Sequence, residues 1–260
     1  MKGLILKDDR RYEYTEKYLK TKGFVFDENI NPKNLDFIIF PFIKEVQQNL
    51  YDDDYFKKLG REVQIFSGVR SEYLAEKSQK YGLNYNVMMD DAGVMAENAV
   101  PTSEGVIAYI IQNMPTTIWG SQILVIGYGN CGRDLAKRLK SLGAGVFGLV
   151  RNKEKENLAK EDAVKPVYTE GVFSHEYDAI INTVPSTVLS EEMLKKTNGA
   201  LLIDIASKPY GFNMELAKTL NEKSSLLPGI PGKYAIKTSG EILGKYIYNI
   251  LRGEQNDIDG

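Results

Sequence analysis

The fold is decided by residues 123–132, which read Ile-Leu-Val-Ile-Gly-Tyr-Gly-Asn-Cys-Gly. The four leading apolar residues predict a buried strand, and Gly127, Gly129 and Gly132 then have the spacing G-x-G-x-x-G. That spacing alone is a weak signal. Its context strengthens it, because leucines at helical spacing follow the turn and a second apolar run occupies residues 146–150. A strand, a tight turn, a helix and a second strand in this order predict a Rossmann-type dinucleotide-binding domain.

Each glycine has a physical role in such a turn. Gly127 allows the tight change of direction, Gly129 lets a pyrophosphate approach the backbone, and Gly132 lets the helix pack closely on the strand. The helix N-terminus would present free N–H groups to the phosphates. We therefore expect cofactor contacts from Gly127, Tyr128, Gly129, Asn130, Cys131 and Gly132. Two alternatives stay open: a glycine-rich turn without a ligand, and a Cys131 that serves only in packing.

The end of the second strand distinguishes between nicotinamide cofactors. An acidic residue there would bind the ribose 2′-hydroxyl and favour NAD. The chain has Arg151, Asn152 and Lys153 instead. Arg151 could pair with a 2′-phosphate through two parallel hydrogen bonds, and Lys153 could add positive charge, so the pattern favours NADP. The alternative is a solvated arginine at the end of a strand.

Two further strand ends should surround the cofactor, because ligands of open α/β sheets bind beyond the carboxyl ends of the strands. One is followed by Thr183, Val184 and Pro185, which should flank the adenosine and its ribose. The other is followed by Ala206 and Ser207, which should lie near the nicotinamide. Asp204, two residues before Ala206, serves either the site or a structural cap.

Composition bounds the classes of function. Thirty-three basic against 35 acidic residues give a net charge of −2, which argues against nucleic acid or an anionic membrane as the main partner. One cysteine and one histidine exclude an intrachain disulfide and a zinc site built from several such ligands, and we expect no metal site. The N-terminus lacks the features of a signal peptide, and no apolar run approaches the ~18–20 residues of a spanning helix. We expect a cytoplasmic protein.

Short apolar runs alternate with polar segments of helical length along the chain of 260 residues. This alternation predicts an α/β protein with two doubly wound parallel-sheet domains. We expect a flavodoxin-like, substrate-side domain at residues 1–101 and the dinucleotide-binding domain at residues 102–235. Apolar residues at helical spacing predict a connecting helix over residues 102–115.

The last segment, residues 236–260, should form a helix that returns to the first domain, followed by a polar tail. Thr238 and Glu241 fit a capping box at the start of that helix.

The substrate side offers three candidates for catalysis. Lys233 ends the loop Pro-Gly-Ile-Pro-Gly-Lys before the last helix, and Lys208 follows another strand. Either lysine would suit a carboxylate. Glu104 would be the best-placed carboxylate for proton transfer if the connecting helix begins beside it. The plain alternatives are two solvated lysines and an acidic residue that merely complements a helix start.

Further substrate contacts are expected from Asn98, Pro101, Thr102, Ser103, Gly232 and Thr238. His175, the only histidine, precedes a predicted core strand and lies away from the carboxyl ends. We expect it at the surface, which counts against a 2-hydroxyacid dehydrogenase with a histidine base. The active cleft should lie between the two domains.

Five segments occur in one order: Asn-Ala-Val-Pro-Thr-Ser-Glu-Gly at 98–105, the glycine turn, Asn-Thr-Val-Pro at 182–185, Asp-Ile-Ala-Ser-Lys-Pro at 204–209, and Pro-Gly-Ile-Pro-Gly-Lys at 228–233. This order closely resembles the A subunit of dipicolinate synthase, over residues ~84–252. The first ninety residues lack the glycine-rich first turn of that family, and Asn130 replaces the family's arginine in the nucleotide turn.

The resemblance implies an NADP-dependent oxidoreductase of spore formation that makes pyridine-2,6-dicarboxylate from a dihydrodipicolinate-type precursor. It also implies a partner, the flavoprotein-like B subunit, with the mother-cell cytoplasm as location, and we expect a homo-oligomer. Two other functions stay open: another NADP-linked oxidoreductase of a small carboxylate, and a nucleotide-binding regulatory or structural subunit that needs a partner for catalysis. Replacing Lys233 with alanine separates them, because only an enzyme has turnover to lose.

Overall fold

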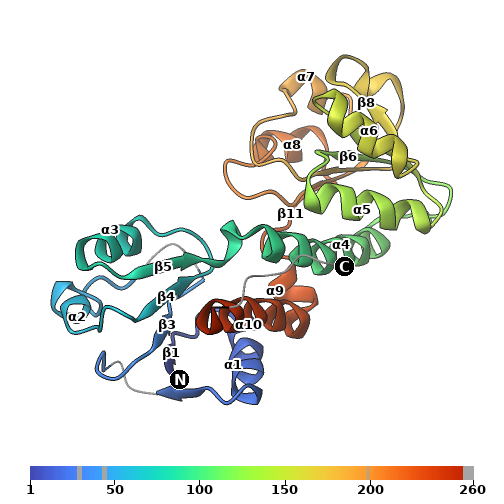
Figure 1. Ribbon diagram of the computed structural model, residues 1–260. Helices are drawn as coiled ribbons and strands as arrows, with labels where there is room; N and C mark the ends of the chain where they lie inside the picture. Colours follow the sequence, from blue (N-terminus) through green and yellow to red (C-terminus); the bar gives the residue numbers. More distant parts are fainter. Residues whose placement is uncertain (28–30, 43–45, 198, 254–260) are drawn as a thin grey trace. The chain divides into compact units, whose positions relative to one another are not determined.

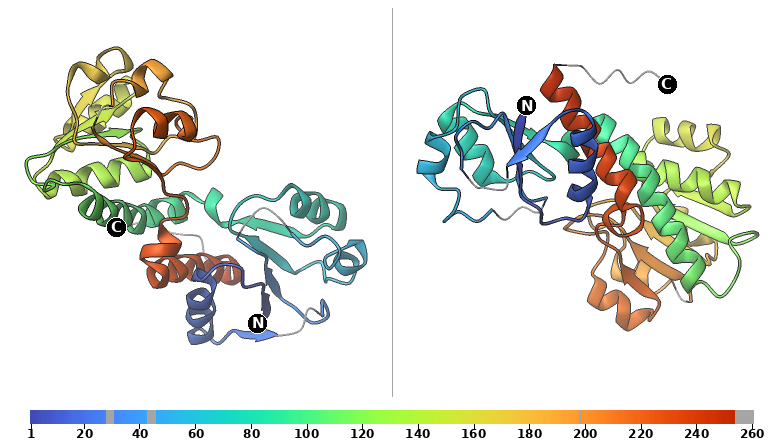
Figure 2. Two further views of the ribbon diagram at one scale, coloured as in Figure 1. Left: turned by 180° about the vertical axis from the view of Figure 1, so that it is seen from behind. Right: turned by 90° about the horizontal axis from the view of Figure 1, so that it is seen from below.

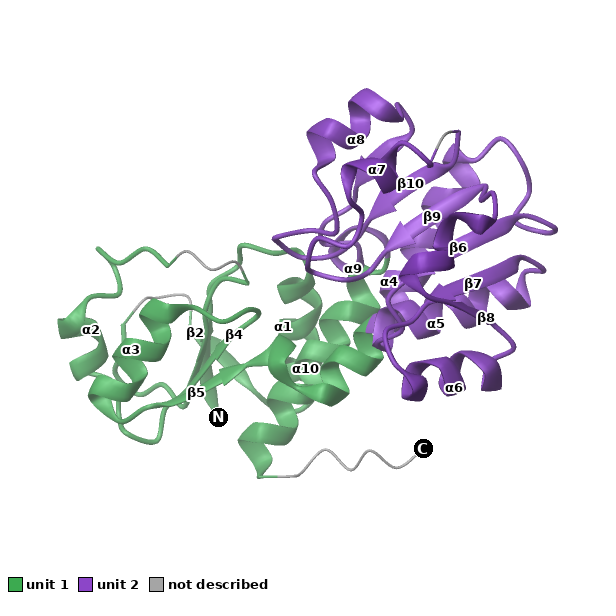
Figure 3. Cartoon of the chain, turned by 90° about the horizontal axis from the view of Figure 1, so that it is seen from above, with its two compact units in different colours: residues 1–98, 235–260 green, residues 99–234 purple. Residues whose placement is uncertain are grey.

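The computed structural model describes residues 1–27, 31–42, 46–197 and 199–253. The chain divides into two compact units (Figure 3): unit 1 comprises residues 1–98 and 235–260, and unit 2 comprises residues 99–234. The sequence predicted domain boundaries between residues 101 and 102 and between residues 235 and 236, within three residues of those observed. Each unit contains one sheet whose described strand pairs are all parallel, so the predicted fold class is confirmed.

Unit 1 has a five-stranded sheet in the order β2-β1-β3-β4-β5 (Figure 1). This is the flavodoxin-like order, which changes direction between β1 and β3. The strands are β1 (Lys2–Ile5), β2 (Val25–Asp27), β3 (Phe37–Ile39), β4 (Gln64–Ser67) and β5 (Asn84–Val87). The helices are α1 (Arg11–Thr21), α2 (Asp53–Lys57), α3 (Glu72–Tyr81), the short η1 (Met88–Asp90) and α10 (Ile236–Arg252).

The C-terminal helix α10 lies beside α1 in unit 1 (Figure 2). The two helices approach closely at Gly240, where an added Cβ would overlap the backbone carbonyl of Arg11. The Thr15 hydroxyl donates a 2.9 Å hydrogen bond to the Gly240 carbonyl across this contact. Apolar side chains of α10, Leu243 and Ile247 among them, complete a core cluster with residues of α1, β3 and β4.

The capping box expected at the start of α10 is wrong. The helix begins at Ile236, its N-cap is Ala235, and no side chain caps it. Thr238 therefore lies exposed inside the first turn. The Glu241 carboxylate lies 3.9 Å from the ammonium of Lys237 one turn away, which is the ordinary i,i+4 pairing within a helix.

Unit 2 has a six-stranded sheet in the order β11-β10-β9-β6-β7-β8. Renumbered from β6, this is the Rossmann order 3-2-1-4-5-6, with its change of direction between β6 and β9. The strands are β6 (Gln122–Ile126), β7 (Gly145–Leu149), β8 (Lys165–Val167), β9 (Ala179–Asn182), β10 (Leu201–Asp204) and β11 (Ser224–Leu226). The helices are α4 (Ala92–Asn113, which begins in unit 1), α5 (Asn130–Ser141), α6 (Lys153–Glu161), the short η2 (Thr169–Ser174), α7 (Glu191–Leu194), α8 (Met214–Leu220) and α9 (Pro231–Tyr234).

Alternate residues of the central strand β6 face two different cores. Ile123 and Val125 pack with α4, α5 and α6 on one face of the sheet. Leu124 and Ile126 belong to the other core, which contains residues of α7 and α8. Because the strand is buried on both faces, it reads as a continuous apolar run rather than as an alternating one. The parallel register aligns the ends of β6 and β9, with Ile126 opposite Asn182.

The connecting helix is much longer than predicted. It begins at Ala92 rather than at Thr102 and ends at Asn113. Asp91 caps it, since its carboxylate accepts a 2.9 Å hydrogen bond from the Val94 N–H. Pro101, just before the predicted start, lies inside the helix. A proline inside a helix removes one backbone hydrogen bond, and its ring crowds the carbonyl four residues earlier, so packing must offset that cost.

None of the described helices is long and apolar enough to cross a bilayer.

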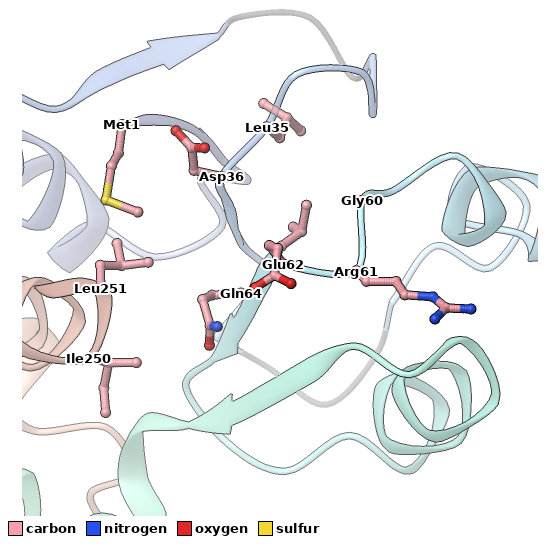
Figure 4. A pocket seen from close by; sticks show the side chains of 10 residues that line it. Met1, Leu35, Asp36, Gly60, Arg61, Glu62, Gln64, Ile250 and Leu251 are labelled. Atoms are coloured by element: carbon pink, nitrogen blue, oxygen red, sulfur yellow. The ribbon is translucent and has the colours of Figure 1, made fainter. Parts of the chain in front are cut away.

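Unit 1 contains a pocket of about 380 Å³ (Figure 4). Asp36, just before β3, Gln64 at the start of β4 and Leu251 of α10 are among its lining residues. The pocket thus lies at the amino ends of the strands, opposite the edge where open α/β sheets bind ligands.

Candidate dinucleotide site

Two glycines of the predicted turn are required by the turn itself. Gly127 has φ +93°, in the left-handed region that glycine favours. A Cβ there would lie 2.7 Å from the hydroxyl of Thr183. A Cβ on Gly132 would overlap the carbonyl oxygen of Gly127, so the first turn of α5 passes directly over the end of β6.

Gly129 has a different environment. Its φ of −87° and ψ of −166° are accessible to any residue, and no atom lies within 4 Å of an added Cβ. Gly129 is also the N-cap of α5, where no side chain accepts a hydrogen bond from the backbone. The first turn contains no acidic residue. The N–H groups at this helix start therefore face open space, which is the arrangement that binds a phosphate.

The loop after β9 fixes one side of the turn. The Thr183 N–H and hydroxyl both donate to the Ile126 carbonyl, at 3.0 and 2.9 Å. Val184 contacts Gly127, and Pro185 is exposed beyond it. The structure thus brings Thr183 and Val184, two of the three residues expected beside the ribose, to the glycine turn at the β6–β9 change of direction.

Tyr128 and Arg133 attach the turn to the end of α6. The Tyr128 ring is buried against Gly148, and its hydroxyl donates a 3.0 Å hydrogen bond to Asp162. The Arg133 guanidinium forms two hydrogen bonds with the same carboxylate, at 2.6 and 3.0 Å. The adjacent guanidinium lowers the pKa of Asp162, while burial raises that of Tyr128. Sequence reasoning missed Arg133 and Asp162, since no motif links residues so far apart.

The other two residues of the turn differ in exposure. Asn130 is exposed at the first position of α5. Cys131 is half-buried, and its thiol is hydrogen-bonded to the hydroxyl of Thr102 on α4. Burial raises the pKa of this thiol, so it stays protonated near neutral pH. These contacts suit the packing role that the sequence left open for Cys131.

The three residues expected at a 2′-phosphate have different partners. Arg151 follows β7, is exposed, and forms no hydrogen bond or ion pair with any residue in the described ranges. The Asn152 side chain caps α6 by accepting from the Lys155 N–H at 2.9 Å. The Lys153 ammonium lies 3.1 Å from both carboxylate oxygens of Glu156. Arg151 alone of the three has a side chain without a partner in this part of the structure.

Asp204 is a structural cap. Its fully buried carboxylate accepts hydrogen bonds from the N–H groups of Ala206 and Gly211, at 2.9 and 2.7 Å. The Asn182 amide donates a third at 2.9 Å. These bonds close the loop after β10, which leaves Ala206 buried and Ser207 exposed.

The two candidate lysines are exposed at loop or short-helix positions. Lys208 lies in the loop after β10, and Lys233 lies in α9, which replaces the end of the expected loop. Neither ammonium has a hydrogen-bond or ion-pair partner among the residues that the structure describes. Both are therefore available to a carboxylate.

Glu104 lies in the middle of α4 and not at a helix start, so the reason for selecting it was wrong. Its carboxylate is exposed and pairs with Arg138 of α5 at 3.3 Å.

The residues expected to contact substrate are distributed over both units. Pro101, Thr102 and Ser103 are buried in α4, and the Ser103 hydroxyl has no hydrogen-bond partner in the described structure. Gly232 is half-buried in α9. Asn98 and Thr238 belong to unit 1. Their roles stay predictions.

His175 is exposed and its ring lies 4.7 Å from that of Phe147, measured between centroids. It precedes β9, away from the carboxyl ends of the strands. Within the described ranges, no three His, Cys, Asp or Glu side chains are grouped so that they could hold a metal ion.

Known families match this geometry. Residues 102–223 match the family of D-isomer specific 2-hydroxyacid dehydrogenases, NAD binding domain. Unit 2 is therefore a dehydrogenase-type domain that binds a nicotinamide dinucleotide. The free N–H groups at the start of α5 and the close approach of Gly132 to Gly127 fit that cofactor.

The dipicolinate synthase A subunit of Bacillus subtilis (strain 168) is 33% identical over 190 residues, which are 72% of this chain and 64% of the relative. The aligned region thus spans less than two thirds of that relative's length.

Two solved structures extend the similarity to nearly the whole chain. The dipicolinate synthase A subunit from Bacillus subtilis superimposes with a TM-score of 0.87 at 26% identity, covering 97% of this chain and 96% of that one. The corresponding protein from Bacillus halodurans gives a TM-score of 0.88 at 24% identity, covering 96% and 97%. By sequence and by fold, this chain is a homologue of the A subunit of dipicolinate synthase.

Proposed function

We propose that the chain is an NADP-dependent oxidoreductase that oxidises a dihydrodipicolinate-type precursor to pyridine-2,6-dicarboxylate. Similarity to the A subunit of dipicolinate synthase supports the reaction, and one structural observation supports the choice of cofactor. Arg151 is exposed and unpaired at the end of β7, in the described structure, where an NAD enzyme would have an acidic residue. A planar guanidinium suits a phosphate because it donates two parallel hydrogen bonds.

The proposed binding mode follows from the turn. The pyrophosphate would lie over Gly129 and accept from the free N–H groups at the start of α5. Thr183 and Val184 would flank the ribose, and Ala206 and Ser207 would border the nicotinamide. When bound, the nicotinamide ring would accept a hydride.

The substrate side is assigned to the two free lysines. Lys208 and Lys233 would each pair with a carboxylate of the dicarboxylate substrate. Oxidation of the dihydro ring removes one hydride and one proton. Glu104 is the proposed proton acceptor, although its ion pair with Arg138 would first have to open.

Calorimetric titration with NADP and NAD, alone and with dipicolinate, tests the proposal. We expect NADP to bind at least about tenfold more tightly than NAD, and dipicolinate to bind only with the nucleotide present. Arg151→Ala should remove most of the preference for NADP while leaving NAD affinity unchanged. No binding of either nucleotide would refute the site, and equal affinities would refute the role of Arg151.

Catalysis is tested separately. Lys233→Ala should abolish turnover and keep NADP affinity, and Lys208→Ala should raise KM for the dicarboxylate. A chain that binds NADP but shows no turnover alone would instead support a partner-dependent subunit.

We also propose a flavoprotein-like B subunit, self-association, and action in the mother-cell cytoplasm. One observation in unit 2 favours a partner: Trp119 is 77% exposed, and Ile111 is 64% exposed. Exposed apolar side chains of this size suit a protein interface. Sedimentation analysis of wild type and Trp119→Ser, with and without the B subunit, tests both forms of association.

A further inference from the structure

Glu156, a buried carboxylate in α6, accepts hydrogen bonds from side chains of α6 and of the segment after β8. Glu156 is 9% exposed and receives three donors. The Lys160 ammonium lies 2.5 Å from one carboxylate oxygen, and the Tyr168 hydroxyl donates to the other at 2.7 Å. Lys153 contacts both oxygens at 3.1 Å. Tyr168 follows β8, which lies beside α6 (Figure 1), so the carboxylate is fixed from two elements.

The three donors hold Glu156 unequally. The Tyr168 hydroxyl donates at 2.7 Å, and Lys160 makes the shortest contact. Lys153 makes the longest contacts, and its side chain is 73% exposed. An exposed ion pair of this kind is weak and exchangeable. Glu156 would keep two donors if Lys153 left, so its own position does not depend on Lys153.

Lys153 lies two residues after Arg151 and immediately after the cap of α6. A 2′-phosphate held by Arg151 would therefore lie within the region that a freed Lys153 side chain can sample. The same ammonium cannot fully serve both anions. The carboxylate is already in place, while the phosphate arrives with the cofactor.

We propose that Glu156 is a specificity-determining residue that withholds Lys153 from the 2′-phosphate and so limits the preference for NADP over NAD. This inference rests on the proposed function. Arg151 then provides the preference for NADP over NAD. Lys153 is a second cation near the 2′-phosphate, but its ion pair with Glu156 keeps it from that phosphate.

The test compares Kd values for NADP and NAD in Glu156→Gln and in a matched control. Gln keeps the shape and an acceptor for Tyr168 but releases Lys153. We expect NADP affinity to rise about two- to fivefold, the range of an exposed ion pair, with NAD affinity unchanged. A merely structural role would change both affinities together.

Glu154→Gln is the control. Glu154 lies in the same first turn, and its carboxylate pairs with Lys155 at 3.0 Å rather than with Lys153. Both substitutions remove one negative charge near the cofactor. Only Glu156→Gln should shift the NADP/NAD ratio beyond this common effect, and the extra shift should vanish in the double variant Lys153→Met/Glu156→Gln.

Equal shifts in the two glutamine variants, or a gain that survives in the double variant, would overturn the proposal. If Glu156→Gln does not fold, Lys153→Met in the native background decides: the proposal expects less than about a twofold change in NADP affinity, because Lys153 is already withheld. A larger loss contradicts it. Failure of the proposed function is distinct, since it shows in the unsubstituted chain and in Arg151→Ala.

Discussion

The glycines of one turn separate the requirements of folding from those of binding. Gly132 is needed for the helix to pass over the end of β6, because a Cβ would strike the carbonyl oxygen of Gly127. Gly129 meets no such obstacle, since the space beside it is open. If that space receives a phosphate, the two positions must respond differently to the same added methyl group.

Gly129→Ala should leave the melting temperature nearly unchanged and weaken dinucleotide binding about tenfold, equivalent to about 1.4 kcal/mol. The methyl group would occupy the path of the pyrophosphate but touches nothing in the chain itself. Thermal unfolding and calorimetric titration of one preparation measure both effects.

Gly132→Ala is the comparison, with an expected loss of about 1–3 kcal/mol in the free energy of unfolding from overpacking. Full dinucleotide affinity in Gly129→Ala would show that the phosphate does not lie there.

Local residues of the site could be predicted, whereas residues that act through tertiary contacts could not. Gly127 and Gly132 have structural roles set by their place in a strand–turn–helix unit, and Arg151 lies at the predicted strand end. Asp162 lies 29 residues from Arg133 and 34 from Tyr128, yet one carboxylate joins them. No periodicity encodes such a pairing, because it depends on how α6 returns to the glycine turn.

At the scale of elements, α6 shows how one buried carboxylate links a helix to a neighbouring strand. Hydrogen bonds from Lys160, Tyr168 and Lys153 lower the pKa of Glu156 from the ordinary 4.5 to about 2. A carboxylate whose pKa is lower in the folded chain stabilises it above the unfolded pKa. That contribution disappears as the pH falls from about 4.5 to about 2.

Glu156→Gln should therefore lower the melting temperature at pH 7, and the difference from wild type should shrink between pH 4.5 and pH 2. Thermal unfolding across this range measures the difference directly. Subtracting the two curves removes the contributions of other carboxylates. A difference that stays constant down to pH 2 would contradict this assignment.

The elements were predicted well where periodicity is strong and poorly at their ends. The apolar stripe of α4 was recognised, but its first ten residues were missed. The stripe begins only near residue 102, whereas Asp91, with its hydrogen bond from the Val94 N–H, marks the real start. Prolines and threonine–glutamate spacings report possible ends, and tertiary packing decides which of them are used.

At the scale of the whole molecule, alternation of strands and helices sufficed to predict two parallel α/β units. Strand order could not be read in the same way, because β1 pairs with β3 and β6 with β9 through contacts distant in sequence. Unit 1 is also discontinuous, since it takes its last helix from the far end of the chain. This discontinuity makes its stability depend on α10.

Truncating the chain after Tyr234 should unfold unit 1 and spare unit 2. Four buried side chains of α10 would leave the core cluster that contains Tyr12 and Phe66: Ile242, Leu243, Tyr246 and Ile247. At about 1.5–3 kcal/mol each, their burial is worth about 6–12 kcal/mol, which is comparable with the stability of a whole domain. Calorimetric unfolding should lose one of its transitions.

Unit 2 keeps the glycine turn, Arg151 and both sheet cores in the truncated chain, so it should still bind the dinucleotide with a Kd within about twofold of the full chain. A control truncation after Gly253 removes only the tail and should keep both transitions. Cooperative unfolding of unit 1 without α10 would show that α1 and the sheet suffice for its core. Loss of dinucleotide binding on truncation would instead show that the site needs residues of unit 1, with Asn98 and Thr238 the first to substitute.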